Sequence, residues 1–261
     1  ENCTYDFWEL LILNMARQGF LGEVVHVDAG YIHDQRELNV SKDKAWRIEE
    51  FINRNGNIYP THGLGPACQL LNVNRGDRLD YLISMSSNDF TMGPKIDELA
   101  KQDDYYEKYK GRWQLGNVNT STIRTKKGKT IMLQYDVSNP RPYDRIQQVV
   151  GTKAISKKYP FPSRISVGHE WLSEEETGIL VEKYTPRLVK LVGEMAKKVG
   201  GHGGMDFLME WRLIDCLRNG LPLDMDVYDA AAWSSVVPLS EWSVAHSSSP
   251  VKFPDYTCGS Y

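Results

Sequence analysis

The sequence has no apolar run long enough to cross a bilayer and no excess of positive charge. Its best apolar run, residues 10–13, is far shorter than the roughly 20 residues that a membrane-spanning helix needs. The formal net charge is −3 and the basic residues are scattered, which gives no electrostatic basis for binding nucleic acid. The sequence therefore predicts neither a membrane protein nor a nucleic-acid-binding protein.

Cysteine and histidine are also sparse, and their spacing indicates no metal site. The six histidines show no H-E-x-x-H arrangement, and the cysteines form no C-x-x-C pair. Four cysteines could make two disulfides, but buried free thiols are the preferred interpretation. These cysteines are Cys3, Cys68, Cys216 and Cys258.

Two further motifs are missing. The glycine-rich segments 63–65 and 200–204 do not follow the G-x-G-x-x-G pattern that binds a dinucleotide between a strand and a helix. A pair of catalytic carboxylates is not evident either, because the acidic runs at 103–104 and 174–176 are typical of solvated helix surfaces. Asp206 follows a glycine-rich segment and is the more interesting acid, although a structural role is favoured.

What the chain does contain is enough apolar material for a core. Of its 261 residues, 41% are hydrophobic, which suits one large domain or two small ones. Asp6 and Glu9 resemble a capping box at the start of the first helix. Helices are predicted at residues 6–18, 45–53, 60–71, 94–109, 186–199, 205–218 and 226–246, the last interrupted near Pro238, with another beginning at 173–176.

The predicted strands follow one another without a helix between each pair. Residues 23–32, 80–86 and 145–155 have strand character, and 113–124 with 130–137 form a hairpin through Lys127-Gly128. This succession favours an antiparallel sheet. Residues 35–44 are predicted to be a loop, and the tail from 247 onward to be irregular.

The most informative segment is residues 55–66, in which a phenol, a hydroxyl and an imidazole lie between glycines and prolines. Pro60 suits the first turn of a helix, where its missing N–H costs nothing. A helix that begins there places Tyr59 and His62 on one face. This pair could bind a hydroxylated ligand and move a proton; the alternative is a helix start with a buried, hydrogen-bonded histidine.

Three segments give the chain a family resemblance. N-I-Y-P-T-H-G-L-G-P at 57–66, S-N-P-R-P-Y at 138–143 and G-H-G-G-M-D-F at 201–207 closely resemble the NAD-dependent α-N-acetylgalactosaminidases. These form glycoside hydrolase family 109, on the Gfo/Idh/MocA oxidoreductase scaffold. The resemblance runs from Glu1 to the vicinity of Tyr256.

The resemblance implies a fold and a domain organisation. It implies an α+β domain with an open, mostly antiparallel sheet and helices on one face. The family binds NAD with an N-terminal Rossmann domain that this chain lacks, so residues 1–261 would be a single substrate-binding and catalytic domain. Residues 1–3 would be its junction with the missing domain. Sheets of relatives often form subunit contacts, so a homo-oligomer through the sheet is expected.

The resemblance also implies a reaction, the release of terminal α-linked N-acetylgalactosamine from glycans. NAD⁺ takes a hydride from the sugar C3, and the resulting ketone acidifies the C2 proton. A base removes that proton, the C1 leaving group departs, water adds, and the hydride returns. The protein must supply a base, hydrogen-bond donors for the enolate, and positioning of C3.

Residues are assigned to this reaction only where they match the family's motifs. Asn2 matches a cofactor-contacting position, and Tyr59 matches one that touches both sugar and nicotinamide. The positions that match substrate-binding residues are Tyr31, Arg47, Tyr59, His62 and Tyr143.

His62 is the first choice for proton transfer, because an imidazole titrates near neutral pH. Tyr31 is the second choice, since a phenol with a pKa of roughly 10 needs activation to act as a base. His202, in the glycine-rich break, could also face the cleft but is left unassigned, with a structural role favoured.

Two other functions remain open at this point. The chain could belong to a sugar oxidoreductase that transfers hydride without cleaving its substrate, or act alone as a non-catalytic assembly or sugar-binding domain. Glu1 is not a natural start residue and no leader follows it, so a fragment or processed product is expected. Family members often carry twin-arginine signals, which makes an extracytoplasmic location in bacteria an expectation.

Overall fold

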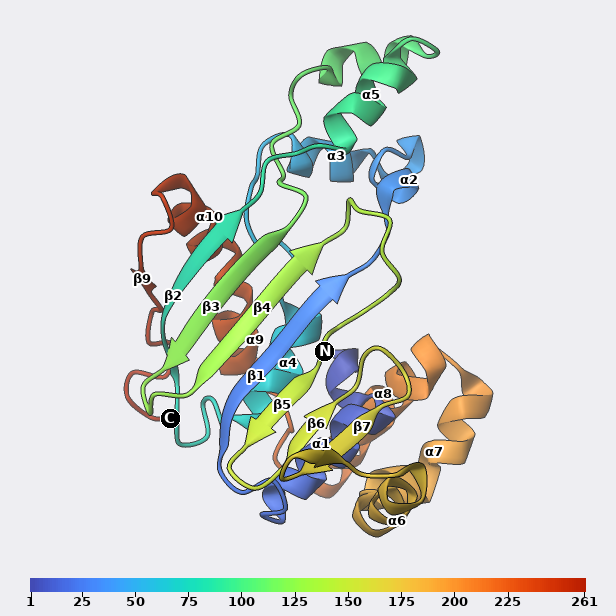
Figure 1. Ribbon diagram of the computed structural model, residues 1–261, viewed down its shortest axis with the longest axis vertical. Helices are drawn as coiled ribbons and strands as arrows, with labels where there is room; N and C mark the ends of the chain where they lie inside the picture. Colours follow the sequence, from blue (N-terminus) through green and yellow to red (C-terminus); the bar gives the residue numbers. More distant parts are fainter.

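One nine-stranded sheet runs through the computed structural model, which describes residues 1–261 (Figure 1). The strand order is β8-β7-β6-β5-β1-β4-β3-β2-β9. The central pair, β1 with β4, is parallel, and every other neighbouring pair is antiparallel. The strands are β1 Val24–Ile32, β2 Leu79–Ser86, β3 Asn119–Thr125, β4 Thr130–Asp136, β5 Gln148–Gly151, β6 Ile155–Lys157, β7 Arg164–Val167, β8 Glu170–Trp171 and β9 Val251–Lys252.

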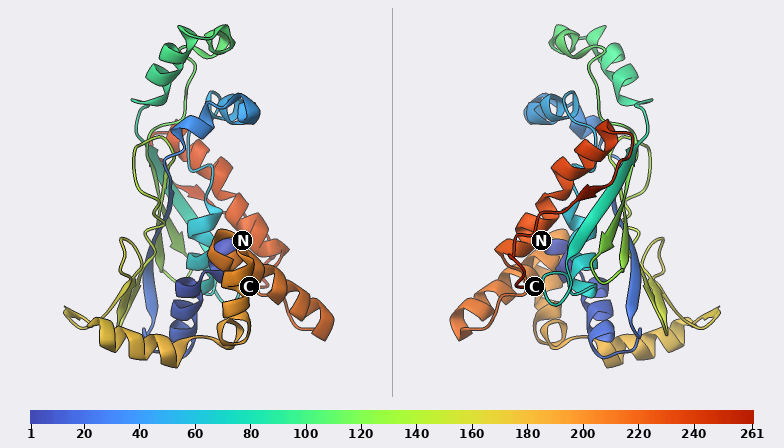
Figure 2. Two further views of the ribbon diagram at one scale, coloured as in Figure 1. Left: turned by 90° about the vertical axis from the view of Figure 1, so that its right-hand side faces the viewer. Right: turned by 90° about the vertical axis from the view of Figure 1, so that its left-hand side faces the viewer.

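The helices cover one face of this sheet and leave the other open (Figure 2). Strand side chains alternate accordingly: Val27 and Leu133 are buried in the main core, whereas His26 and Asp28 of the same region face the open side. The α-helices are α1 Phe7–Arg17, α2 Arg36–Asn39, α3 Ala45–Phe51, α4 Thr61–Leu70, α5 Met92–Ala100, α6 Glu174–Tyr184, α7 Arg187–Val199, α8 Met205–Asn219, α9 Val227–Ser234 and α10 Val236–Ala245. Short 3₁₀ helices are η1 Asn2–Tyr5, η2 Lys42–Lys44, η3 Asp104–Tyr109 and η4 His202–Gly204.

Two smaller apolar clusters flank the main core. Helices α2, α3 and α5 form a cap beyond the ends of β1 and β4, held together around Ile48, Phe51 and Ile96 (Figure 1). At the other end, η1, α7 and α8 pack around Tyr5 and Leu208. The predicted α+β fold, with a mostly antiparallel sheet and helices on one face, is confirmed.

Most predicted elements are present, and three predictions differ from the structure in their bounds or type. The helix predicted at 94–109 is two elements, because the Asp103 side chain accepts the Tyr105 N–H and starts η3. Residues 35–44 contain α2 and η2 rather than a loop. The strand predicted at 145–155 is β5 and β6 joined by a turn, in which the Gly151 N–H donates to the Ala154 carbonyl.

The C-terminal third also departs from the expectation in places. The last helix breaks at Ser235, and Pro238 instead occupies the first turn of α10, where its missing N–H costs nothing. The tail contributes β9, which pairs with β2. The helix signal at 173–176 is confirmed as a capping box between Ser173 and Glu176.

The capping box predicted from Asp6 and Glu9 is wrong, because both carboxylates bind buried cations instead. Asp6 is the N-cap residue of α1 but makes no side-chain cap hydrogen bond. Arg145 Nη2 donates to Asp6 at 2.5 Å and to Glu9 at 2.7 Å, and Lys158 Nζ donates to the same two residues at 2.7 and 2.6 Å. The charges of two carboxylates and two cations thus balance one another around Arg145, which is 1% exposed.

Breaking this ion cluster is expected to destabilise the fold. Replacing Lys158 with Met leaves Glu9 buried with one cation fewer, which should lower the free energy of unfolding by about 3–5 kcal/mol. Urea denaturation measures the change. As the matched control, Lys101→Met removes an exposed pair with Glu98 and should cost about 1 kcal/mol or less. Similar losses in both variants would show that the buried cluster contributes no more than a surface pair.

Candidate active site

Gly63 allows the segment around His62 to lie directly on the sheet. A Cβ atom added at Gly63 would lie 2.7 Å from the Gly30 nitrogen and 2.9 Å from Leu133 Cδ1. Helix α4 can therefore approach the backbone of β1 only because Gly63 lacks a side chain. This contact brings His62, in the first turn of α4, to the end of β1 where Tyr31 lies.

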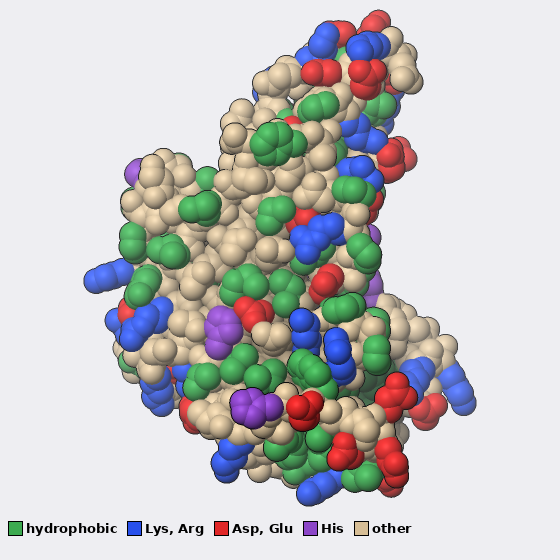
Figure 3. All heavy atoms as spheres, viewed as in Figure 1, with side chains coloured by type: hydrophobic (Ala, Val, Ile, Leu, Met, Phe, Trp, Pro, Cys, Tyr) green, Lys and Arg blue, Asp and Glu red, His purple; other side chains and the backbone are tan.

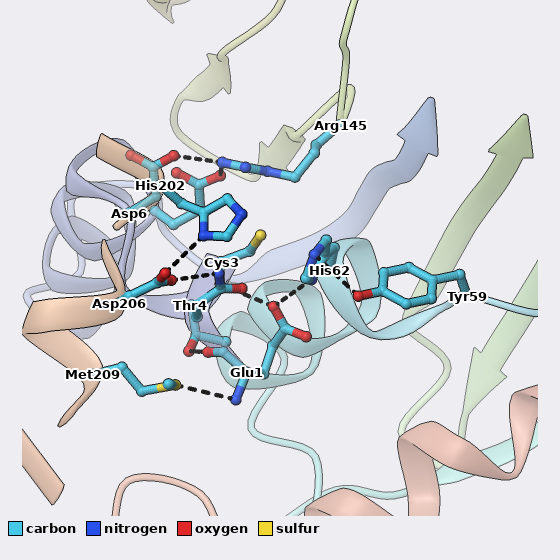
Figure 4. A network of polar contacts seen from close by, with 12 residues as sticks. Glu1, Cys3, Thr4, Asp6, Tyr59, His62, Arg145, His202, Asp206 and Met209 are labelled. Carbon is cyan, nitrogen blue, oxygen red and sulfur yellow. Dashed lines mark hydrogen bonds and ion pairs between the residues drawn. The ribbon is translucent and has the colours of Figure 1, made fainter. Parts of the chain in front are cut away.

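Tyr59 and His62 lie in contact, as predicted, although α4 begins one residue after the predicted start at Pro60. Pro60 is the N-cap residue of α4 and Thr61 its first residue, so Tyr59 precedes the helix. The Tyr59 hydroxyl still lies 3.5 Å from His62 Nε2, and the two rings are perpendicular with centroids 4.9 Å apart (Figure 4). Short spacing in the chain thus keeps phenol and imidazole together.

Tyr31 stands at the centre of an aromatic cluster drawn from three parts of the chain. Its ring centroid lies 4.8 Å from that of Tyr59, 5.3 Å from that of His62 and 6.3 Å from that of Tyr143. Burial, with the neighbouring phenols of Tyr59 and Tyr143, raises the pKa of Tyr31 to about 12. At neutral pH the Tyr31 hydroxyl is therefore protonated and can donate a hydrogen bond.

Arg47 reaches this cluster through one intermediate side chain. Its Nη1 donates to Gln35 Oε1 at 3.1 Å, and Gln35 Nε2 donates to the Tyr31 hydroxyl at 2.9 Å. On the other side, Arg145 Nη1 donates to the Tyr143 hydroxyl at 2.9 Å. Both phenolic oxygens accept a hydrogen bond from the protein, which leaves their protons free for a ligand.

Glu1 is a site residue that sequence reasoning missed. Its carboxylate lies 2.8 Å from His62 Nδ1 and accepts the Cys3 N–H at 2.9 Å (Figure 4). Burial raises the pKa of Glu1, but the His62 imidazole and the Cys3 N–H outweigh it and lower the pKa to about 2. No local signal could have found this pair, because Glu1 and His62 are 61 residues apart.

The glycine-rich break carries a second histidine–carboxylate pair. His202 Nδ1 lies 2.7 Å from Asp206 Oδ2, and the other oxygen of Asp206 accepts Asn2 Nδ2 at 2.7 Å. Burial raises the pKa of Asp206, whereas its bonds to His202 and Asn2 lower it, and the net shift is downward. Asn2 and Glu1 are adjacent in the chain, so both pairs meet at the N-terminal edge of the domain (Figure 4).

Glu1, Cys3 and His62 are the one group whose ligand atoms, all within 4.8 Å, could hold a metal ion. Glu1 and His62 already bind each other, and burial raises the pKa of the Cys3 thiol, which keeps it protonated at neutral pH. These residues are satisfied without an ion. All four cysteines are free as expected, with Cys258 exposed rather than buried.

The fold of this chain is similar to that of solved sugar dehydrogenases. A levoglucosan dehydrogenase in complex with NADH and L-sorbose matches 97% of this chain and 65% of its own, with a TM-score of 0.65 and 13% identity. An inositol dehydrogenase homologue from Azotobacter vinelandii, complexed with NADH and myo-inositol, matches 97% and 63%, with a TM-score of 0.60 and 13% identity. At this identity the likeness concerns the fold alone, which is that of the C-terminal domain of Gfo/Idh/MocA oxidoreductases.

Sequence similarity then fixes the family. The family described as "Glycosyl hydrolase 109, C-terminal domain" matches residues 5–261. A glycosyl hydrolase family 109 protein from Solibacter usitatus is 48% identical over all of this chain and 59% of its own length, and one from Phocaeicola vulgatus is 45% identical over all of this chain and 65% of its own. The chain belongs to glycosyl hydrolase family 109, as the motifs indicated. It spans about three fifths of the length of these relatives.

The Glu1–His62 pair makes stability depend on pH in a defined direction. The Glu1 pKa falls from 4.5 to about 2 on folding, so its contribution is fully present above pH 4.5 and is lost as the pH falls toward 2. A shift of this size corresponds to a loss on the order of 3 kcal/mol. Between pH 6 and pH 2, the free energy of unfolding of wild type should fall by this much more than that of Glu1→Gln. Urea denaturation at each pH measures both values. The control, Glu98→Gln on the exposed surface, should run parallel to wild type; a parallel Glu1→Gln curve would contradict the pair.

Proposed function

We propose that this chain, joined to a nucleotide-binding domain, releases terminal α-linked N-acetylgalactosamine from glycans by an NAD-dependent route. The observation that carries the proposal is the cluster of Tyr31, Tyr59, His62 and Tyr143 around one point, with a carboxylate behind the imidazole. Such a site offers a proton acceptor and neutral donors, which suits proton abstraction next to a carbonyl. Membership of glycosyl hydrolase family 109 supports the same reading.

The residues at the N-terminal edge fit the nicotinamide end of NAD. Asn2 commits its amide nitrogen to Asp206, which leaves its carbonyl oxygen as an acceptor for a carboxamide N–H. Tyr59, which contacts His62, offers a half-exposed ring. When bound there, NAD would accept a hydride from the sugar C3 and return it after cleavage.

His62 is the proposed base for the C2 proton. With Nδ1 bound to the anionic Glu1, the imidazole carries its proton on that side and presents the lone pair of Nε2 toward Tyr59. Glu1 therefore selects the tautomer that can accept a proton and stabilises the imidazolium that forms.

Tyr31 and Tyr143 are proposed as donors to the sugar. Their hydroxyls already accept hydrogen bonds from Gln35 and Arg145, and burial raises the pKa of both phenols. A protonated phenol in this position can stabilise a developing enolate oxygen. This favours His62 over Tyr31 as the base and keeps Arg47 as a hydrogen-bonding group for sugar hydroxyls.

The open sheet face is proposed to bind a second copy of the chain. Ile83 and Met85 of β2 point away from the helices and are exposed, with Met132 of β4 partly exposed on the same face. Figure 3 shows apolar side chains distributed among polar ones over this face. An antiparallel face that carries exposed aliphatic groups is suited to pairing by self-complementary contact.

The route can be tested with an aryl α-N-acetylgalactosaminide deuterated at C2, in the full-length protein with its nucleotide-binding domain. We expect release that requires NAD⁺ and loses the C2 deuterium, and a fall in kcat of about 10²–10⁴-fold in His62→Asn. The exposed His169→Asn should behave as wild type. Release with full deuterium retention would overturn the route. NADH formation without release would identify a sugar oxidoreductase instead.

The proposed sheet contact predicts an effect on oligomeric state. Light scattering on Met85→Arg should show a shift toward monomer, because a charge would be buried at the contact. Met195→Arg, an exposed methionine on α7 away from the sheet, serves as the matched control. A monomeric wild type, or an equal response in both variants, would count against the sheet contact.

A further inference from the structure

A pocket adjoins the aromatic cluster at Tyr59. It is a cavity of about 250 Å³ between α3, the segment before α4, and β4. Tyr31, His62 and Tyr143 do not line it, so Tyr59 is the one residue that belongs both to the aromatic cluster and to the lining of the cavity. Its lining includes Trp46, Arg47, Glu50, Arg54, Tyr59 and Tyr135.

The lining contains the kinds of side chain that carbohydrate sites use. The indole of Trp46 is 57% exposed at the rim, although a large aromatic side chain usually buries most of its surface. The Arg47 guanidinium lies 4.8 Å from the indole, and its buried Nε has no hydrogen-bond partner within the chain. A flat apolar surface beside planar donors can hold the CH face and the hydroxyls of a sugar ring at once.

Glu50 supplies acceptors on the same helix. One oxygen of its carboxylate accepts Arg54 Nη1 at 2.8 Å, and Arg54 is held in turn by Glu241 at 2.6 Å. The carboxylate is thereby fixed while its second oxygen has no partner within the chain. Donors and acceptors therefore face one cavity from one short helix.

Arg47 connects this cavity to the proposed reaction site. Its Nη1 donates to Gln35, which donates to the Tyr31 hydroxyl, so two consecutive hydrogen bonds join the lining of the cavity to the aromatic cluster. The cavity is smaller than the roughly 300–1,000 Å³ of pockets that take drug-sized ligands, which suits one sugar ring rather than a long chain.

We propose that this cavity binds the sugar unit next to the one that is cleaved, with Trp46 as its stacking surface and Glu50 as its hydrogen-bonding group, and with Arg47 between the two sugar units. The inference rests on the proposed glycosidase function and makes the substrate an oligosaccharide of at least two sugar units. A substrate with a small leaving group would leave this cavity unused and lose the binding energy that it offers.

The test compares two substrates in the full-length protein. One is methyl α-N-acetylgalactosaminide, and the other is a disaccharide with α-N-acetylgalactosamine linked to galactose. We expect wild type to prefer the disaccharide in kcat/KM, and Trp46→Ala to reduce that preference about tenfold, as the loss of one aromatic contact implies. Glu50→Gln should reduce it severalfold. The control is Trp171→Ala, which removes an indole that is 43% exposed on β8 and should keep the wild-type preference.

The outcomes separate this inference from the proposed function. Equal kcat/KM for the two substrates in wild type, or an unchanged preference in Trp46→Ala, would overturn the second sugar site while hydrolysis stands. If neither substrate is cleaved, the proposed function fails. Calorimetric titration with the disaccharide then decides the site by itself: an equal Kd in wild type and Trp46→Ala would overturn it, and a Kd raised about tenfold would support it.

Discussion

Close contact between the backbone of Gly30 in β1 and Gly63 of α4 determines where His62 lies relative to Tyr31. A side chain at Gly63 would meet the backbone of β1, so any larger residue would push α4 away from the sheet. With α4 seated, His62 lies beside Tyr31, and Gly65 leaves room for Glu1 and Thr4 against the helix. Gly63 therefore serves the packing of α4 on the sheet, and Gly65 serves the packing of the N-terminal segment on α4. The polar residues beside them are those proposed for the chemistry.

The buried ion cluster also positions a residue of the proposed site. Arg145 is held by Asp6 and Glu9 and passes a further hydrogen bond to Tyr143, so one guanidinium joins the start of α1 to a proposed substrate contact. Burying four charges costs desolvation that their attraction must offset. What the cluster supplies is a hydrogen bond that fixes the direction of the Tyr143 hydroxyl.

The sequence predicted what depends on neighbours in the chain. β1, the β3–β4 hairpin, the Ser173 capping box and the Tyr59–His62 pair follow from spacing and turn residues over a few positions. The family motifs added the fold and the placement of Tyr31 and Tyr143 near the same point.

What could not be predicted depends on partners far away in sequence. Asp6 and Glu9 have the pattern of a helix cap, but their cations lie 136 to 152 residues further on. Glu1 could not be predicted as a site residue for the same reason, because its partner His62 is 61 residues away in the chain. The cavity beside Trp46 depends on packing between α3 and β4, which no local pattern encodes.

These distances also bear on how the chain acquires its structure during synthesis. The central strands β1 and β4 pair residues more than a hundred positions apart, and Lys158 follows Glu9 by 149 residues. At roughly 5–20 residues per second, ribosomes would leave the Glu9 carboxylate without its lysine for about 10 to 30 seconds. Helix α1 and strand β1 therefore emerge long before the partners that bury them, and this nascent segment must avoid aggregation until the second half of the domain arrives.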